Sequence, residues 1–343
     1  MTGTDRTDPT RRRVLQLAAA AGLAACTSSR TRADHVPDAG APGEAPRAAP
    51  APAPTDAPGA APSPTNTSTS MNTRPIPRTG EPIPVIGLGT WQTFDVGSDP
   101  EERAPLAEVL TRFFAAGGRV IDSSPMYGRA EAVTGDTLAA TGAIGTPFLA
   151  TKVWTRGKRE GIEQMERSLE RMRATRMDLM QVHNLLDWQT HLPVLREWKQ
   201  AGKVRYIGVT HYAHSAFGDL ERLIRTEALD FVQLPYNLAD REAEQRLLPA
   251  AADTGTAVLV MRPFAEAGLF RAVKGKPLPG WAAEIDCTSW AQLFLKFILG
   301  HPAVTCPIPA TSNPKHLADN VQAGRGRLPD EAMRRKMIEL LDE

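Results

Sequence analysis

The feature that most constrains the fold is a regular alternation of short apolar runs with longer amphipathic segments. Eight β-rich runs occur in the second part of the chain, at residues 84–91, 119–122, 147–152, 177–183, 204–210, 230–235, 256–261 and 303–309. Most of them are continuous apolar runs with little polar alternation, which is typical of parallel strands buried on both faces.

The segments between these runs have helical character. Apolar residues recur three and four positions apart at 106, 109, 110, 113 and 114, and again at 162, 165, 169 and 172. Further helices are expected over residues 188–201, 214–227, 239–252, 288–299, 313–323 and 329–341. Eight strands that are each followed by a helix predict an α/β fold of the closed (β/α)8 type, the TIM barrel.

A dinucleotide-binding Rossmann unit is the alternative to test. Gly87-Leu88-Gly89 begins like its glycine fingerprint, but the third glycine is missing and the chain continues into QTFDVGSDP instead of a helix. The acidic residue about twenty positions further on is Glu108, which lies within a helical stripe. The fingerprint therefore lacks its required context, and we reject this alternative.

Polar side chains gather where three consecutive predicted strands end. Asp122 ends the second strand and Tyr127 follows it, Lys152 ends the third strand, and His183 ends the fourth. Active sites of such barrels lie at the carboxyl ends of the strands. Each residue alone is more often structural, but together they indicate a catalytic site.

These four groups suit proton delivery to a carbonyl oxygen. A phenol has a pKa near ~10, and a neighbouring ammonium is expected to lower the pKa of Tyr127. Asp122 would pair with Lys152, and His183 would hydrogen-bond the same carbonyl oxygen. Because a proton donor alone reduces nothing, a cofactor must supply the hydride.

Other classes of site find little support. The sequence contains neither G-x-S-x-G nor H-E-x-x-H, and Cys287 and Cys306 lack metal-ligand spacing. We interpret both cysteines as ordinary small residues, with a single disulfide between them left open. The 40 basic and 39 acidic residues are interspersed, which argues against a nucleic-acid partner.

The globular part resembles the aldo-keto reductase family along essentially its whole length. The matching motifs are, in order, GLGTW, IDSSPMYG, ATKVW, QVHN, IGVT, FVQLPYN and IPATSNPKHLADN. The resemblance implies an oxidoreductase that reduces an aldehyde or ketone with NADP(H), bound without a Rossmann domain. It also implies a catalytic tetrad of Asp122, Tyr127, Lys152 and His183, with Tyr127 as the acid.

The resemblance further implies which residues surround the cofactor and the small-molecule carbonyl substrate. The nicotinamide would contact Thr90, Trp91, Asp122, Thr210, His211 and Gln233, and Met261, Arg262 and Pro263 would lie nearby. The adenosine phosphate end would lie against Pro309, Ala310, Thr311, Ser312, His316 and Asn320. The substrate pocket would be walled by Trp91, Phe94 and Trp154.

Some of these positions depart from the common pattern of the family. His211 replaces an asparagine, and Met261 replaces the aromatic ring that usually stacks on the nicotinamide. Arg262 follows Met261 and is a candidate contact for a cofactor phosphate. Ala310 and His316 stand where many members carry Lys and Arg, which weakens the preference for NADP(H) and leaves NAD(H) open.

The N-terminal part has a different composition. Residues 1–26 carry the sequence TRRRVLQLAAAAGLAAC, which resembles a twin-arginine export signal ending in a lipobox at Cys26. Residues 27–71 are rich in Ala, Pro, Ser and Thr and predict a disordered tether, whereas residues 72–343 form the predicted barrel. We therefore expect the twin-arginine machinery to export the protein, and a lipid at Cys26 to anchor it at the periplasmic or other extracytoplasmic face.

An exported location raises a second functional class. Little reduced nicotinamide is expected outside the cytoplasmic membrane, so the barrel could act as a nucleotide-binding sensor or scaffold with little turnover. The complete set of four rim residues favours the enzyme, because a scaffold has no need of all four.

Overall fold

The computed structural model describes residues 70–341. The predicted signal sequence, Cys26 and nearly all of the predicted tether, in residues 1–69, lie outside the described residues.

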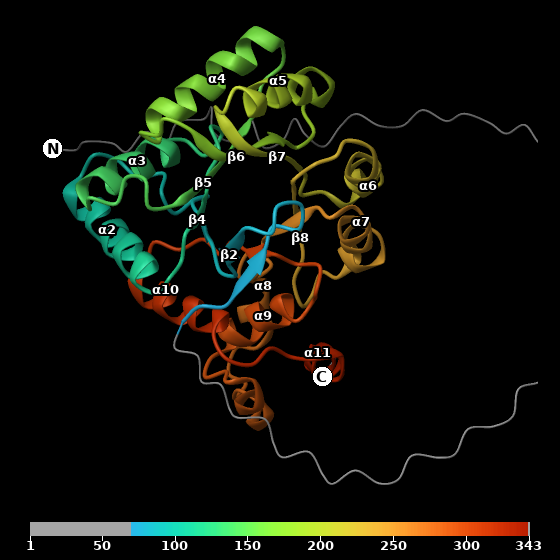
Figure 1. Cartoon of the computed structure of the whole chain (residues 1–343). Coiled ribbons are helices and arrows are strands. Elements are labelled where there is room, and N and C mark those ends of the chain that lie inside the picture. Colours follow the sequence, from blue (N-terminus) through green and yellow to red (C-terminus); the bar gives the residue numbers. More distant parts are fainter. Residues whose placement is uncertain (1–69, 342–343) are drawn as a thin grey trace, which may run out of the picture. The chain divides into compact units, whose positions relative to one another are not determined.

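Eight parallel strands form one curved sheet in chain order, with helices around its outside (Figure 1). The strands are β3 (Leu88–Gly89), β4 (Val120–Asp122), β5 (Phe148–Val153), β6 (Met177–His183), β7 (Val204–Thr210), β8 (Phe231–Pro235), β9 (Ala257–Met261) and β10 (Cys306–Pro307). The first and last strands meet, since the amide of Gly87 donates to Pro307 O at 2.9 Å and that of Gly89 to Pro309 O at 3.2 Å. The predicted (β/α)8 barrel is thereby confirmed.

Most helices follow the predicted pattern. They are α2 (Pro100–Ala115), α3 (Ala130–Ala140), α4 (Lys158–Arg171), α5 (Trp188–Gln200), α6 (Phe217–Thr226), α7 (Leu247–Thr254), α8 (Gly268–Ala272), α9 (Trp290–Leu299), α10 (Pro314–Asn320) and α11 (Glu331–Glu339). Short 3-10 turns lie at η1 (His214–Ala216), η2 (Glu242–Gln245), η3 (Gly280–Ile285) and η4 (Val321–Gly324).

Helix α3 was not predicted, because its sequence has no apolar stripe. Its buried positions are mostly small or polar residues, including Thr134 and Gly135, so no apolar face stands out. A Cβ at Gly135 would lie 2.1 Å from the carbonyl oxygen of Arg171. The lack of a side chain there is what lets α3 approach the end of α4.

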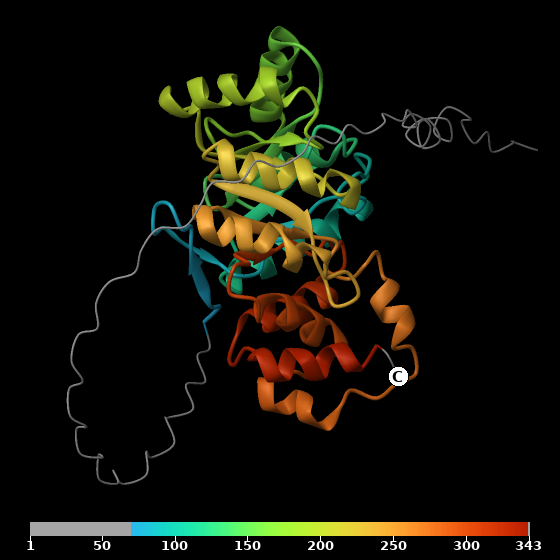
Figure 2. The same cartoon turned by 90° about the vertical axis from the view of Figure 1, so that its right-hand side faces the viewer.

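An antiparallel hairpin that the sequence did not predict closes one end of the barrel. It consists of β1 (Thr73–Pro75) and β2 (Pro82–Pro84) and is seen in blue in Figure 2. Its Ile76 and Ile83 belong to the hydrophobic cluster inside the barrel. The other members of that cluster are Val120, Phe148, Ala150, Leu179, Tyr206, Phe231, Ala257, Leu259, Cys306 and Ile308. The hairpin therefore fills the end of the barrel where the strands begin.

The interior faces of the strands change from apolar to polar along the barrel. Successive side chains of a strand point to opposite faces, so residues two apart share a face. In β5 the interior series Phe148, Ala150 ends in Lys152, and in β6 Leu179 is followed by Gln181 and His183. The polar residues thus form the last interior layer, at the carboxyl ends of the strands.

One question left open by the sequence is answered within residues 70–341. Cys287 and Cys306 are both buried and both free, so no disulfide joins them. In this part of the chain no His, Cys, Asp and Glu residues cluster in a way that could hold a metal ion. None of the described helices is long and apolar enough to cross a bilayer.

Candidate active site

A buried ion pair lies at the centre of the polar layer. Lys152 Nζ is 2.7 Å from Asp122 Oδ2 and donates a second bond of 2.6 Å to the carbonyl oxygen of Ser123. Burial by itself would lower the pKa of Lys152, but Asp122 and the nearby Tyr127 outweigh it, and the pKa lies above its ordinary value. Lys152 is therefore a permanent buried cation at neutral pH.

Tyr127 lies beside this cation. Lys152 Nζ is 5.1 Å from the centroid of the Tyr127 ring. Burial raises the pKa of the Tyr127 phenol, and the ammonium of Lys152 offsets only part of that rise. The expected lowering of this pKa is wrong for the structure described here, because desolvation of the phenolate outweighs its attraction to the ammonium. The phenol thus holds its proton at neutral pH.

His183 completes the predicted group of four. Its ring centroid is 6.0 Å from that of Tyr127, with the two ring planes nearly perpendicular. Burial, together with the charge of Lys152, lowers the pKa of His183 to about 2, so the imidazole is neutral. Its Nδ1 is 3.0 Å from Ser124 Oγ, which leaves Nε2 as the atom available to a ligand.

Other residues hold these groups; the sequence predicted Thr90 only as a nicotinamide contact, and Gln181, Ser123 and Ser124 were missed. Gln181 Nε2 donates to Asp122 Oδ1 at 3.3 Å, and the Thr90 hydroxyl donates to the carbonyl oxygen of Asp122 at 3.0 Å. Ser123 and Ser124, which bond Lys152 and His183, directly follow Asp122 in the sequence. Gln181 could have been found from the alternation of strand faces. It lies two residues before His183 and therefore shares the interior face of β6.

Three unpaired polar atoms belong to residues at or near the carboxyl ends of the consecutive strands β6, β7 and β8. They are Asn184 Oδ1, Thr210 Oγ1 and Gln233 Nε2, all buried and without a hydrogen-bond partner. Asn184 was also missed, although it directly follows His183. An amide ligand carries both donors and an acceptor and would satisfy such a set. These residues therefore fit the carboxamide of a nicotinamide.

The residues that depart from the family pattern follow β7 and lie at the end of β9. The His211 ring stacks on Tyr212 with centroids 5.5 Å apart, and its Nδ1 accepts a bond from the amide of Ala213. Arg262 Cζ lies 4.8 Å from the centroid of the Tyr212 ring, and Arg262 Nε pairs with Glu266 at 3.2 Å. Met261 is half-buried and Pro263 is buried at the end of β9.

The three residues predicted to wall the substrate pocket differ in their exposure. Trp91 and Trp154 are exposed at 40% and 37%, and the Trp154 ring lies 6.3 Å from that of His183. Phe94 is fully buried in the hydrophobic core. The assignment of Phe94 to the substrate pocket is wrong, because a turn in which its amide bonds Thr90 O carries the ring inward.

The segment predicted for the adenosine phosphate end follows β10. Pro309 and Thr311 are buried, whereas Ala310, Ser312 and His316 are exposed. Asn313 caps helix α10 by accepting a bond of 2.9 Å from the amide of Lys315. Asn320 is buried at the end of this helix.

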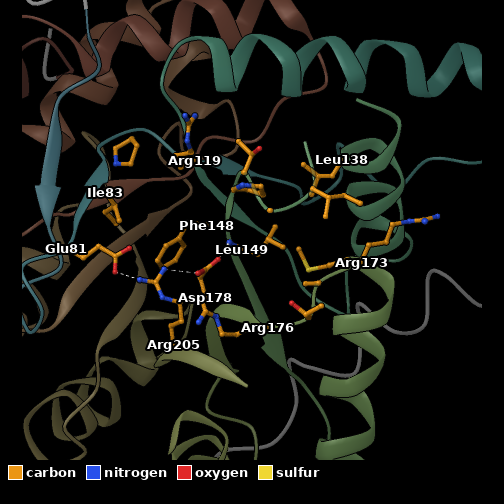
Figure 3. A pocket seen from close by; sticks show the side chains of 18 of the residues that line it. Glu81, Ile83, Arg119, Leu138, Phe148, Leu149, Arg173, Arg176, Asp178 and Arg205 are labelled. Atoms are coloured by element: carbon orange, nitrogen blue, oxygen red, sulfur yellow. Dashed lines mark hydrogen bonds and ion pairs between the residues drawn. The ribbon is translucent and has the colours of Figure 1, made fainter. Parts of the chain in front are cut away.

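A cavity of about 570 Å³ lies at the other end of the barrel, where the strands begin (Figure 3). Its central arginine, Arg205, lies between Glu81 and Asp178 and pairs with both. Arg119, in the same lining, bonds the carbonyl oxygen of Gly118 at 2.7 Å. Because its central charges pair with one another and the catalytic layer lies at the opposite end, we assign this cavity no chemistry.

Comparison with known protein families assigns the chain to one of them. The model of the aldo/keto reductase family matches residues 85–338. The chain belongs to the aldo/keto reductase family. The resemblance inferred from the motifs is thereby confirmed.

Individual relatives of this aldo/keto reductase are distant. A methylglyoxal reductase of Escherichia coli is 28% identical over 245 residues, which cover 69% of the chain and 84% of that protein. An NADH-specific methylglyoxal reductase of Escherichia coli is 27% identical over 249 residues, covering 62% and 73%.

A solved structure shares the fold. The aldo/keto reductase of Klebsiella pneumoniae, crystallised with NADP and acetate, is 26% identical with a TM-score of 0.65. The match covers 76% of this chain and 93% of that one.

Proposed function

We propose that this aldo/keto reductase reduces an aldehyde or ketone with NADP(H), using Tyr127 as the general acid. The observation that carries the proposal is the buried cation of Lys152, held 2.7 Å from Asp122 and 5.1 Å from the Tyr127 ring. A buried ammonium beside a protonated phenol is suited to stabilising the phenolate that forms when the proton leaves.

In the proposed reaction, the carbonyl carbon gains a hydride and the carbonyl oxygen gains the proton of Tyr127. A bound nicotinamide supplies the hydride. Neutral His183 donates a hydrogen bond from Nε2 to the same oxygen, in the tautomer whose Nδ1 accepts from the Ser124 hydroxyl. Asp122 keeps Lys152 charged and in place throughout the step.

Three groups of residues would hold the cofactor. The unpaired atoms of Asn184, Thr210 and Gln233 suit the carboxamide. Met261 would cover one face of the nicotinamide ring, and Arg262 is the candidate residue for binding a cofactor phosphate. The segment 309–320 would hold the adenosine end. One relative named above has NADP in its structure, whereas another is described as NADH-specific. Of the two cofactors, we propose that this protein prefers NADP(H).

Substitution of the proposed acid tests the function. Tyr127→Phe should reduce kcat for methylglyoxal with NADPH by about 100- to 10,000-fold, because it removes the proton donor. Binding of NADPH, followed by fluorescence, should be unchanged. Tyr212→Phe, at an exposed rim tyrosine, is the matched control and should retain activity. Native turnover by Tyr127→Phe would refute the assignment.

The cofactor preference has its own test. Titration with NADPH and NADH should give tighter binding of NADPH, and His316→Arg should strengthen NADPH binding several-fold without affecting NADH, since a guanidinium pairs bidentately with a phosphate. Equal strengthening of both would place position 316 away from the 2′-phosphate.

The proposal also includes export and lipid anchoring. Its support is the order of the arginines, the apolar run, the small residues and Cys26 in residues 10–26. Replacing Arg11, Arg12 and Arg13 with lysine should retain the protein in the cytoplasm of a host with the twin-arginine machinery. Cys26→Ser should release it from the membrane fraction. Unchanged fractionation of both variants would contradict this part.

A further inference from the structure

We propose that Gln164 is the positioning residue for Trp154 and thereby sets the preference of the enzyme for carbonyl substrates with a large apolar body. The inference rests on the proposed function and adds a residue that does not itself touch the reacting atoms.

Gln164 bonds both backbone polar groups of Trp154. The amide of Trp154 donates to Gln164 Oε1 at 2.5 Å, and Gln164 Nε2 donates to the carbonyl oxygen of Trp154 at 3.2 Å. Gln164 lies on α4, whereas Trp154 directly follows β5. A single side chain on a helix therefore fixes the backbone from which the indole projects.

Two further side chains hold the rest of the same segment, residues 154–157. His191, which is fully buried, bonds the carbonyl oxygen of Thr155 through Nε2 at 2.8 Å. The amide of Gly157 donates to Asp187 Oδ2 at 2.8 Å. A Cβ at Gly161 would lie 2.5 Å from the His191 ring, so α4 needs a glycine where the imidazole passes. The segment is thus held along its length, with Gln164 at the end nearest the active site.

The indole held in this way lies beside the reacting groups. Its ring centroid is 6.3 Å from that of His183, with the planes inclined at 56°, and 37% of the residue is exposed. A carbonyl oxygen bound between Tyr127 and His183 brings the rest of its molecule past this ring. Large apolar substrates would contact Trp154 closely, whereas small ones would scarcely reach it. We call the two hydrogen bonds between Gln164 and Trp154 the clamp. Loss of the clamp should therefore weaken the binding of large apolar substrates only.

Two substrates that differ in one group provide the measurement. Phenylglyoxal and methylglyoxal share the reactive dicarbonyl, and a phenyl ring replaces a methyl group. Gln164→Met removes both hydrogen bonds at similar volume. It should raise KM for phenylglyoxal about five- to tenfold, with kcat and the constants for methylglyoxal changed less than about twofold. Gln164→Glu keeps the acceptor but not the donor, so its effect should be intermediate.

Three comparisons separate positioning from a merely structural role. Gln200→Met, at an exposed glutamine ending α5, should change neither substrate. In a Trp154→Ala background, Gln164→Met should have no further effect on phenylglyoxal. Equal losses with both substrates, or the same loss without the indole, would overturn the inference.

A measurement that does not depend on turnover distinguishes this inference from the proposed function. The chain has six tryptophans, so 5-fluorotryptophan labelling should give six fluorine resonances, and Trp154→Phe identifies the one for position 154. Gln164→Met should shift or broaden that resonance alone. If it stays unchanged, the positioning role is wrong even if the enzyme is active. If it moves while the native protein reduces neither dicarbonyl, the clamp stands and the proposed function fails.

Discussion

The ion pair between Asp122 and Lys152 gives a quantitative test of the electrostatics of the active site. Both side chains are almost completely buried, at 3% and 0% exposure, and they are 2.7 Å apart. Asp122→Asn would keep the shape of the side chain but leave the ammonium without its carboxylate. The ammonium would retain its bond to the carbonyl oxygen of Ser123.

The expected loss of stability follows from that geometry. Removal of one partner of a buried ion pair costs about 3–5 kcal/mol, and the remaining bond to Ser123 favours the lower end. For a domain of this size each kcal/mol lowers Tm by about 2 °C or slightly more. We therefore expect Asp122→Asn to lower Tm by about 6–10 °C near neutral pH.

The dependence of stability on pH should also change. In the native protein the pKa of Lys152 is raised above that of the unfolded chain, so its stabilising contribution is complete below about pH 10 and is lost only at higher pH. Without Asp122, burial should lower the pKa of Lys152 below its unfolded value. The unfolded chain then binds more protons, so the stability of Asp122→Asn should rise as pH increases toward about 10.

Thermal melts followed by circular dichroism at pH 6, 8 and 9.5 would measure both effects. Glu197→Gln is the control, because its pair with Lys158 is 3.5 Å long with both side chains about 60% exposed. It should shift Tm by about 2 °C or less. The double variant Asp122→Asn with Lys152→Met should recover much of the lost stability. If Asp122→Asn alone kept the native Tm and the native pH dependence of stability, this account of the buried ion pair would be refuted.

Three further substitutions test other parts of the structure. Ser124→Ala should reduce kcat about three- to tenfold with little change in Tm, because the bond that orients His183 is lost. Steady-state kinetics and a thermal melt would measure both effects, and an unchanged kcat would contradict this role. Phe94→Ala should lower the free energy of unfolding by about 3–5 kcal/mol, in urea denaturation, as expected for a core residue; a change in KM with native stability would return Phe94 to the substrate pocket. Gly135→Ala should destabilise by about 1–3 kcal/mol in the same assay, since the new methyl group meets the carbonyl of Arg171; native stability would show that α3 and α4 can separate freely.

Much of the fold was predictable because barrel strands are short and their order follows the chain. The predicted strands 177–183 and 204–210 match β6 and β7 residue for residue. The hairpin β1–β2 was missed because its three-residue strands contain prolines and too few apolar residues to form a pattern. Helix α3 was missed because its buried face is built from small and polar residues.

The four catalytic candidates could be predicted because a strand end is a position along the chain. The sequence places Asp122, Lys152 and His183 at the ends of neighbouring strands, and parallel pairing then brings those ends to one rim. That local pattern also determines the type of chemistry, since it selects an acid, an ammonium, a phenol and an imidazole. The order of the matching motifs indicated the family, and the alternation of strands and helices predicted the barrel.

Only the tertiary structure decided how those groups behave. The pKa of Tyr127 depends on how much protein surrounds the phenol as well as on its distance from Lys152, and burial proved the larger effect. The clamp of Gln164 on Trp154 and the burial of Phe94 depend on how a helix and a turn pack against the strand ends. Desolvation and packing sum over many atoms distant in sequence, so no local pattern of residues contains them.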